Sequence, residues 1–188
     1  GLPGLTMVGL PETTVKEARD RVRSALINSG YAFPAKKITI NLAPADLPKE
    51  GGRYDLPIAL ALLVASEQLN TTRLNQYEFV GELALTGGLR GVPGAIPSAM
   101  EAIKAGRRIV VSSDNGAEVG LIGGSDCLVA DHLQEVCAFL AGQTSLSPPL
   151  AEAPARDERY EDLLDVIGQQ QGKRALEIVA AGGHNLLL

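Results

Sequence analysis

The chain has few aromatic residues, few cysteines and no long apolar run. Aromatic residues make up 4% of its 188 residues and tryptophan is absent, so base-stacking surfaces of the kind that single-strand binders use are poorly supplied. The two cysteines, Cys127 and Cys137, form no CxxC motif, which favours free thiols in a reducing compartment over a disulfide framework. No apolar run approaches the roughly 18 residues of a membrane span, and no signal peptide is visible. We therefore expect a cytoplasmic protein that does not enter the membrane.

The charge is distributed unevenly along the chain. The net charge is −5, yet residues 1–53 carry eight Lys and Arg against five Asp and Glu. The remaining residues carry nine against seventeen. This asymmetry permits a local basic face, although the chain as a whole will not bind nucleic acid on charge alone.

The order of the expected elements predicts an α/β (α+β) domain with a mixed sheet covered by helices. Apolar runs and period-two alternation predict strands at 2–10, 37–42, 107–111 and 127–129, and a β-hairpin from 77–85 and 89–92. Apolar residues at helical spacing, with capping and stop signals, predict helices at 14–30, 55–68, 97–105, 117–122 and 132–140.

The composition changes after Gly142. Residues 143–160 are rich in proline, serine and alanine with scattered charge, the pattern of a linker. We therefore expect a domain at 1–142, the linker, and a second module that begins at 161–188 with a helix near 171–181 and an apolar strand at its end. The chain lacks an initial methionine and stops within that apolar run, so we expect it to be trimmed at both ends.

The charged loop before the apolar helix at 55–68 is the one local candidate for a binding site. Lys49 and Arg53 could contact phosphates, and Lys36 and Lys37 could extend the basic patch. The alternative interpretation is that Asp55 caps the following helix and the glycines turn the chain. The local chemistry shows no catalytic residues, and neither histidine pairs with a cysteine or carboxylate at metal-ligand spacing, so no metal site is expected. His132 is interpreted as a helix cap or a surface residue.

Several longer runs resemble the bacterial ComM (YifB) family of magnesium-chelatase-like AAA+ ATPases. The resemblance covers nearly the whole chain apart from the linker. It is carried by GLTMVGLPE at 4–12, NLAPADLPKEGG at 41–52, DLPIA at 55–59, GELAL at 81–85, and KRALEI at 173–178 followed by GGHNLLL at 182–188.

The resemblance implies a protein of several domains. Its first domain would be similar to the proteolytic domain of Lon protease, with the ribosomal S5-like fold, and an AAA+ module and a chelatase-like region would follow. Family members are linked to natural transformation as hexameric, ATP-driven helicases that move branched DNA junctions. The resemblance therefore implies that the full-length protein uses ATP and Mg²⁺, binds branched or single-stranded DNA and self-associates as a hexamer.

The resemblance also implies that two activities are missing from this chain. Asp55 stands where the Lon-type catalytic serine would be, and Ile96 lies where the partner lysine is expected, so no nucleophile and base remain and peptidase activity should be lost. The family's phosphate-binding loop (Walker A) would begin just after Leu188. No ATP-binding residue or cofactor is therefore expected within these residues, and the chain should not hydrolyse ATP.

The leading hypothesis is a non-catalytic N-terminal domain of a ComM-like ATPase that engages DNA, supports oligomer assembly, or does both. A magnesium-chelatase-type motor subunit and a Lon-type ATP-dependent protease are the alternatives from the enzyme class, and the absent dyad argues against the second. A pure assembly scaffold is the remaining alternative.

Overall fold

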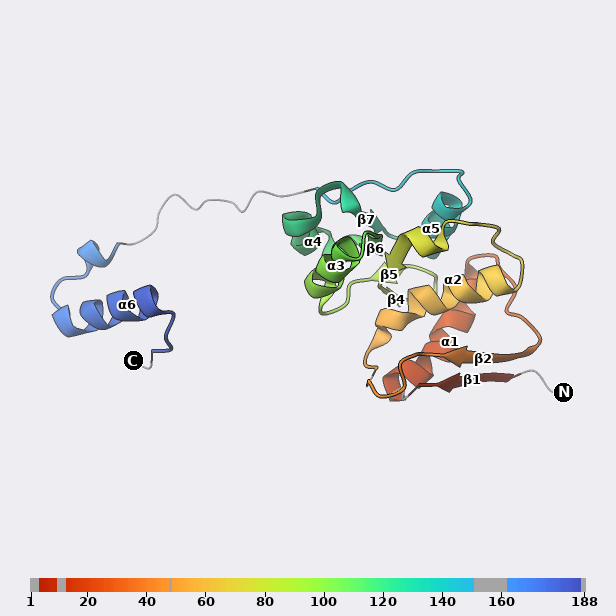
Figure 1. Ribbon diagram of the computed structural model, residues 1–188, viewed down its shortest axis with the longest axis horizontal. Coiled ribbons are helices and arrows are strands. Elements are labelled where there is room, and N and C mark those ends of the chain that lie inside the picture. The colour runs from red at the N-terminus through yellow and green to blue at the C-terminus, as the bar shows by residue number, and fades with distance from the viewer. Residues whose placement is uncertain (1–3, 10–12, 48, 151–161, 187–188) are drawn as a thin grey trace. The chain divides into compact units, whose positions relative to one another are not determined.

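The computed structural model describes residues 4–9, 13–47, 49–150 and 162–186 (Figure 1). The chain divides into two compact units, Gly1–Glu152 and Ala153–Leu188. In the described ranges, no helix is both long and apolar enough to cross a lipid bilayer.

The described residues of the first unit form three small sheets. Two parallel strands form the first, β1 (Gly4–Val8) and β2 (Lys37–Asn41). The second is parallel in the order β3-β6-β7, formed by Tyr77–Phe79, Arg108–Ser112 and Cys127–Ala130. The third is the antiparallel pair β4 (Glu82–Leu83) and β5 (Leu89–Arg90). The predicted α/β class is confirmed, but the parallel and antiparallel pairings are divided among these sheets instead of sharing one.

Five helices pack against these sheets. They are α1 (Thr13–Asn28), α2 (Asp55–Ala65), α3 (Ala95–Lys104), α4 (Gly116–Gly123) and α5 (Leu133–Leu140). Short 3-10 turns lie at Gly52–Tyr54, Leu74–Gln76, Ser113–Asn115 and Gly124–Asp126. All five helices agree with the helical segments predicted from the sequence, within three residues at nearly every end.

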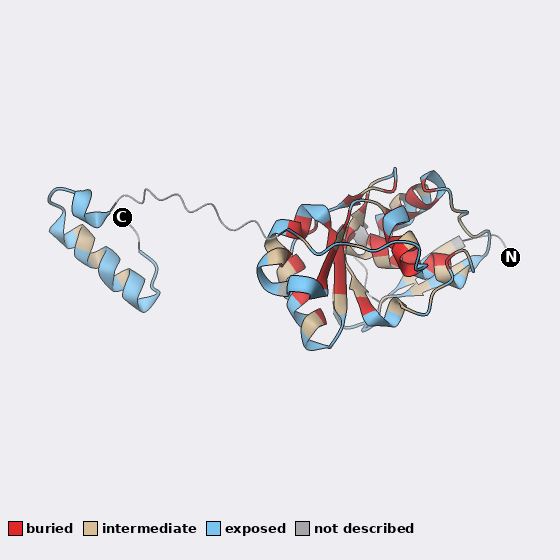
Figure 2. Cartoon of the chain, turned by 90° about the horizontal axis from the view of Figure 1, so that it is seen from above, coloured by how far each residue is buried: buried red, intermediate tan, exposed pale blue. Residues whose placement is uncertain are grey.

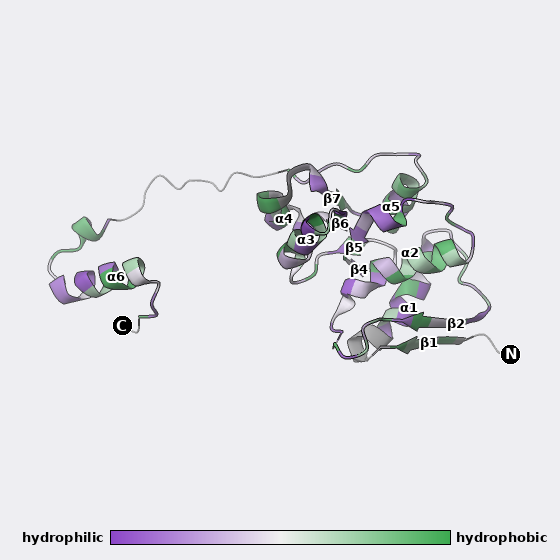
Figure 3. Ribbon diagram, viewed as in Figure 1, coloured by the Kyte–Doolittle hydropathy of each residue, from purple (hydrophilic) through white to green (hydrophobic). Residues whose placement is uncertain are grey.

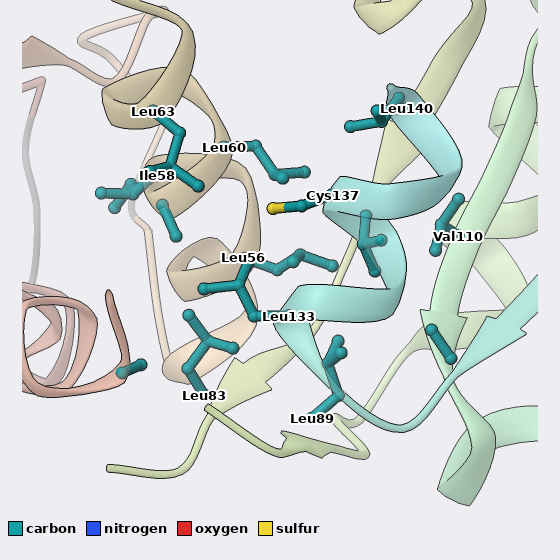
Figure 4. Close-up of a cluster of buried hydrophobic side chains, with 14 of the residues drawn as sticks. Leu56, Ile58, Leu60, Leu63, Leu83, Leu89, Val110, Leu133, Cys137 and Leu140 are labelled. Carbon is teal, nitrogen blue, oxygen red and sulfur yellow. The ribbon is translucent and has the colours of Figure 1, made fainter. Parts of the chain in front are cut away.

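The main core lies around α2, as the close-up in Figure 4 shows. Figure 2 shows buried residues throughout the interior of the first unit. Leu56, Leu60 and Leu63 of α2 are almost completely buried. Leu56 and Leu60 face Leu133 and Cys137 of α5 (Figure 4). Each fully buried leucine contributes about 1.5–3 kcal/mol, so the continuous apolar run of α2 anchors the unit.

The predicted hairpin arm at 77–85 is only partly correct. Its first part, β3, pairs in parallel with β6, and only β4 pairs with β5. The chain leaves the first pairing at Gly81, whose amide donates to the Arg53 carbonyl while its own carbonyl accepts from Leu56. A Cβ atom at Gly81 would lie 2.8 Å from a Leu89 methyl carbon. The close approach of this backbone to the start of α2 therefore interrupts the strand.

Residues 141–150, which follow α5, belong to the first unit. The Val129 amide donates to the Ser147 carbonyl over 3.0 Å, and Leu146 packs against the core. The linker predicted from the composition, 143–160, begins in this stretch. The remainder of that predicted linker, 151–160, lies outside the described residues, and the domain boundaries stay a prediction.

The second unit contains the 3-10 turn Leu163–Asp165 and the helix α6 (Gln170–Gly182). The helix confirms the prediction for 171–181. The expected strand after Gly183 does not form at 184–186, and 187–188 lie outside the described residues. Leu164 and Ile167 are 85% and 97% exposed, and no described residue of this unit is buried. The described part of the unit therefore has no apolar core of its own.

Candidate nucleic-acid interface

Asp55, the residue that the sequence resemblance places at the catalytic serine, is locked in a buried ion pair. Its carboxylate accepts hydrogen bonds from Arg21 Nε at 2.7 Å and Arg21 Nη2 at 3.0 Å. The Leu83 amide donates to the same carboxylate over 3.2 Å. Asp55 is the first residue of α2, and the preceding Tyr54 holds the N-cap position without a side-chain bond. The interpretation of Asp55 as a helix cap is therefore wrong, because its side chain turns to α1 and β4 instead.

Burial and bonding act in opposite directions on this pair. Burial raises the pKa of the Asp55 carboxyl above its ordinary value, while the bonds from Arg21 and the Leu83 amide oppose the rise. The hydrogen bond to Asp55 raises the pKa of the Arg21 guanidinium, against the effect of its own partial burial. The pair joins α1, α2 and β4, so its function is to hold these elements together.

The other position implied for a catalytic dyad holds no base. Ile96 lies in the first turn of α3 and is half-buried. Two residues away, the Ser98 hydroxyl donates to the Gly94 carbonyl at 2.9 Å. Lys104, the nearest lysine along the chain, is exposed and lies 3.5 Å from Glu101. The arrangement supplies neither an activated hydroxyl nor an amine beside it.

No group of three or more His, Cys, Asp or Glu side chains in the described part of the chain is placed to hold a metal ion. His132 is the N-cap of α5: its Nδ1 accepts from the Gln134 amide at 3.2 Å. Its Nε2 lies 3.1 Å from the Thr86 carbonyl oxygen. The interpretation of His132 as a cap is confirmed.

The four predicted phosphate-binding cations do not form one patch. Lys49 is only 4% exposed, and its ammonium donates to the Pro44 carbonyl. Arg53 Nη2 donates to the Pro93 carbonyl over 3.0 Å. Lys36 and Lys37 are exposed, and they lie at the amino end of β2, whereas the loop of Lys49 follows its carboxyl end (Figure 1). Since a strand rises about 3.3 Å per residue, the two pairs are separated by the length of β2.

One arginine of α1, Arg23, contacts the segment that leads to the exposed lysines. Arg19 and Arg23 are exposed and occupy positions i and i+4 of the helix, which places them on one face. The Arg23 guanidinium carbon lies 5.4 Å from the centre of the Phe33 ring. Phe33 is three residues before Lys36. The spacing of the two arginines is visible in the sequence, but the approach of Arg23 to this segment depends on the fold.

A groove of about 600 Å³ adjoins the two lysines. It lies between residues 32–38 and the end of α2. The Gln68 side chain closes one wall by exchanging hydrogen bonds of 2.7 and 2.8 Å with the Ala32 backbone. Glu67 also lines the groove and lowers its positive potential.

Comparison with known proteins identifies the family. Residues 1–115 match the family described as subunit ChlI of Mg-chelatase. Residues 162–188 match a second family description, magnesium chelatase, subunit ChlI. The chain belongs to the Mg-chelatase ChlI family. The similarity stated from the sequence motifs is thereby confirmed.

Relatives place the chain among the ComM/YifB-type members of this family. It is 75% identical to the uncharacterized protein YifB of Salmonella typhimurium, over all 188 residues and 37% of that protein. It is 54% identical to the competence protein ComM of Haemophilus influenzae, again over the whole chain and 38% of that protein. An uncharacterized protein of Mycobacterium bovis is 40% identical over a similar share. The chain thus spans little more than a third of the length of these relatives.

Proposed function

We propose that the first unit is a non-catalytic accessory domain of a ComM-like AAA+ ATPase, with a Lon-protease-like (S5-like) fold, and that it engages DNA. The observation that carries the first part is the Asp55–Arg21 ion pair. A carboxylate with 0% exposure and three hydrogen bonds cannot replace a serine nucleophile. Ile96 supplies no base in the place of the lysine.

The second unit would be the beginning of the ATPase module. Its match to the magnesium chelatase family and its exposed apolar side chains support this assignment. ATP and Mg²⁺ would bind to the remainder of the full-length protein, which would assemble as a ring, a hexamer by the family resemblance. The cytoplasm remains the predicted location.

DNA engagement is supported by the exposed cations of the first unit. Lys36 and Lys37 can reach phosphates directly. Lys49 and Arg53 are bonded to backbone carbonyls and would have to exchange those bonds for phosphate contacts. In the full-length protein this domain would hold branched or single-stranded DNA while the motor moves it.

The test is DNA-dependent ATP hydrolysis by the full-length protein. The protein is compared with a variant that lacks residues 1–142, using branched DNA and no DNA. We expect both proteins to hydrolyse ATP without DNA and only the intact protein to respond to low DNA concentrations. Equal responses from the two proteins would contradict DNA engagement by this domain.

Oligomer assembly is the second candidate role, and one surface favours it. Met100 of α3 and Leu121 of α4 are 56% and 64% exposed, and the two helices pack against each other. Figure 3 shows strongly hydrophobic residues on α4. Light scattering of the full-length protein with Met100→Lys/Leu121→Lys tests this role: the substitutions should reduce the assembly, and an unchanged mass would argue against it. A chelatase-type motor is the alternative for the whole protein, and recovery of a porphyrin-linked partner with it would favour that alternative.

A further inference from the structure

The cations of the first unit fall into two groups by their partners. Most of those with described side chains are bonded to a carboxylate or a backbone carbonyl. This engaged group contains Arg21, Lys49, Arg53, Arg73, Arg90, Lys104, Arg107 and Arg108. Within the described residues of the unit, Arg19, Arg23, Lys36 and Lys37 make no such ion pair or hydrogen bond.

One contact links the two arginines of α1 to the segment that carries the two lysines. Arg19 and Arg23 lie one turn apart on α1, and Phe33 brings the next segment under Arg23. Lys36 and Lys37 follow Phe33 at the start of β2. Because like charges at this spacing repel each other, an unpaired cluster carries a cost that an incoming polyanion removes.

The contact with Phe33 also orders one of the four side chains. A guanidinium over an aromatic ring is attracted by the ring's electron density, so Arg23 loses less freedom when it binds a phosphate. Asp20 lies beside Arg19 in sequence and Glu67 lines the groove next to the lysines, and neither forms an ion pair with the four cations.

We propose that Arg19, Arg23, Lys36 and Lys37 form a single surface, the α1 basic face, that binds the phosphate backbone of DNA. This proposal rests on the proposed DNA engagement. It assigns the phosphate contacts to these four residues instead of Lys49 and Arg53. Among the described contacts of these four cations, the one aromatic ring is Phe33, which Arg23 partly covers. The α1 basic face therefore reads charge and not base sequence.

The experiment is fluorescence anisotropy of the 188-residue chain with a labelled duplex and a labelled single strand of unrelated sequences, over a range of salt. Four phosphate contacts predict a slope of log K against log salt of about −3.6 for the duplex and about −2.8 for the single strand. For the duplex this corresponds to a loss of about 150-fold in affinity between about 50 and 200 mM salt. Arg19→Ala/Arg23→Ala should halve the slope. The loss of duplex affinity over that range of salt should then be about 12-fold.

A matched control removes two exposed cations that are already paired. Lys104 and Arg107 bond to Glu101 and Glu78, so Lys104→Ala/Arg107→Ala changes the net charge equally and should leave the slope unchanged. Lysine in place of both α1 arginines keeps the charges and should keep most of the slope. Thermal unfolding of each variant separates lost binding from lost folding.

Three outcomes would overturn the proposal, and they are distinguishable. If Lys49→Ala/Arg53→Ala lowers the slope and Arg19→Ala/Arg23→Ala does not, DNA engagement holds but the surface is wrong. If the wild-type chain shows no salt-dependent binding, the α1 basic face fails, while the full-length ATPase response still tests the proposed function. If the chain binds phosphatidylserine vesicles and not DNA, the face is a membrane-surface site.

Discussion

Replacing Arg21 by alanine should destabilise the first unit severely, because it leaves the Asp55 carboxylate buried without its charged partner. Asp55 has 0% exposure, and two of its three hydrogen bonds come from Arg21. Breaking a buried pair by removing one partner costs about 3–5 kcal/mol. With a urea m-value of about 2 kcal/mol per M, the midpoint of unfolding should fall by about 1.5–2.5 M.

The arginine at 107 provides the control. Arg107 lies only 2.6 Å from Glu78, but the side chains of this pair are 43% and 44% exposed. An exposed pair contributes about 0–1 kcal/mol, so Arg107→Ala should shift the urea midpoint by no more than about 0.5 M. Burial, and not the distance between the atoms, then accounts for the difference between the two variants.

The pH dependence of Arg21→Ala gives a further check. Without the guanidinium, burial raises the pKa of Asp55 with less opposition, so the folded variant takes up a proton more readily than the unfolded chain. The difference in the free energy of unfolding between the wild type and Arg21→Ala should therefore be largest at neutral pH. It should shrink as the pH falls through that raised pKa. A cost below about 1 kcal/mol at pH 7, or a difference that grows with acidity, would refute the role given to the pair.

Three other predictions concern the thiols, a turn and the two positions that the resemblance assigns to a Lon-type dyad. Burial raises the pKa of the Cys127 and Cys137 thiols. Because the thiols of the unfolded chain then ionise first, the free energy of unfolding should decline as the pH rises above about 8.5. Rapid alkylation by iodoacetamide without denaturant would contradict the burial of these thiols. Gly87→Ala should lower the melting temperature more than Gly106→Ala, because both have positive φ but only at Gly87 would a Cβ atom meet a serine oxygen, at 2.3 Å; equal shifts would argue against the close contact. Asp55→Ser should not create a peptidase, since its lysine partner is also missing, and casein hydrolysis by this variant would disprove that.

Local sequence patterns predicted the elements because their causes are local. The apolar run after Asp55 forms α2 and is buried over most of its surface, and the alternation at 37–42 forms β2 with one face inward. The hairpin arm was misjudged at Gly81 because the interruption comes from contacts with Arg53 and Leu56, which are distant in sequence.

The candidate site was less accessible to sequence reasoning. Asp55 and Arg21 are separated by 34 positions, so their pairing could not be read from spacing, and Asp55 was interpreted as a cap. Lys49 was grouped with Lys36 by charge, yet it is buried against a carbonyl. Which cations remain without an ion pair is a property of the fold, and that property adds Arg19 and Arg23 to the two predicted lysines.

The most direct test of the account is the salt dependence of DNA binding by the wild-type chain and by a variant in which Arg19, Arg23, Lys36 and Lys37 are all alanine. The account predicts a duplex slope of about −3.6 for the wild type and a slope near zero for the variant, with both proteins folded. A variant that retains the wild-type slope would contradict it.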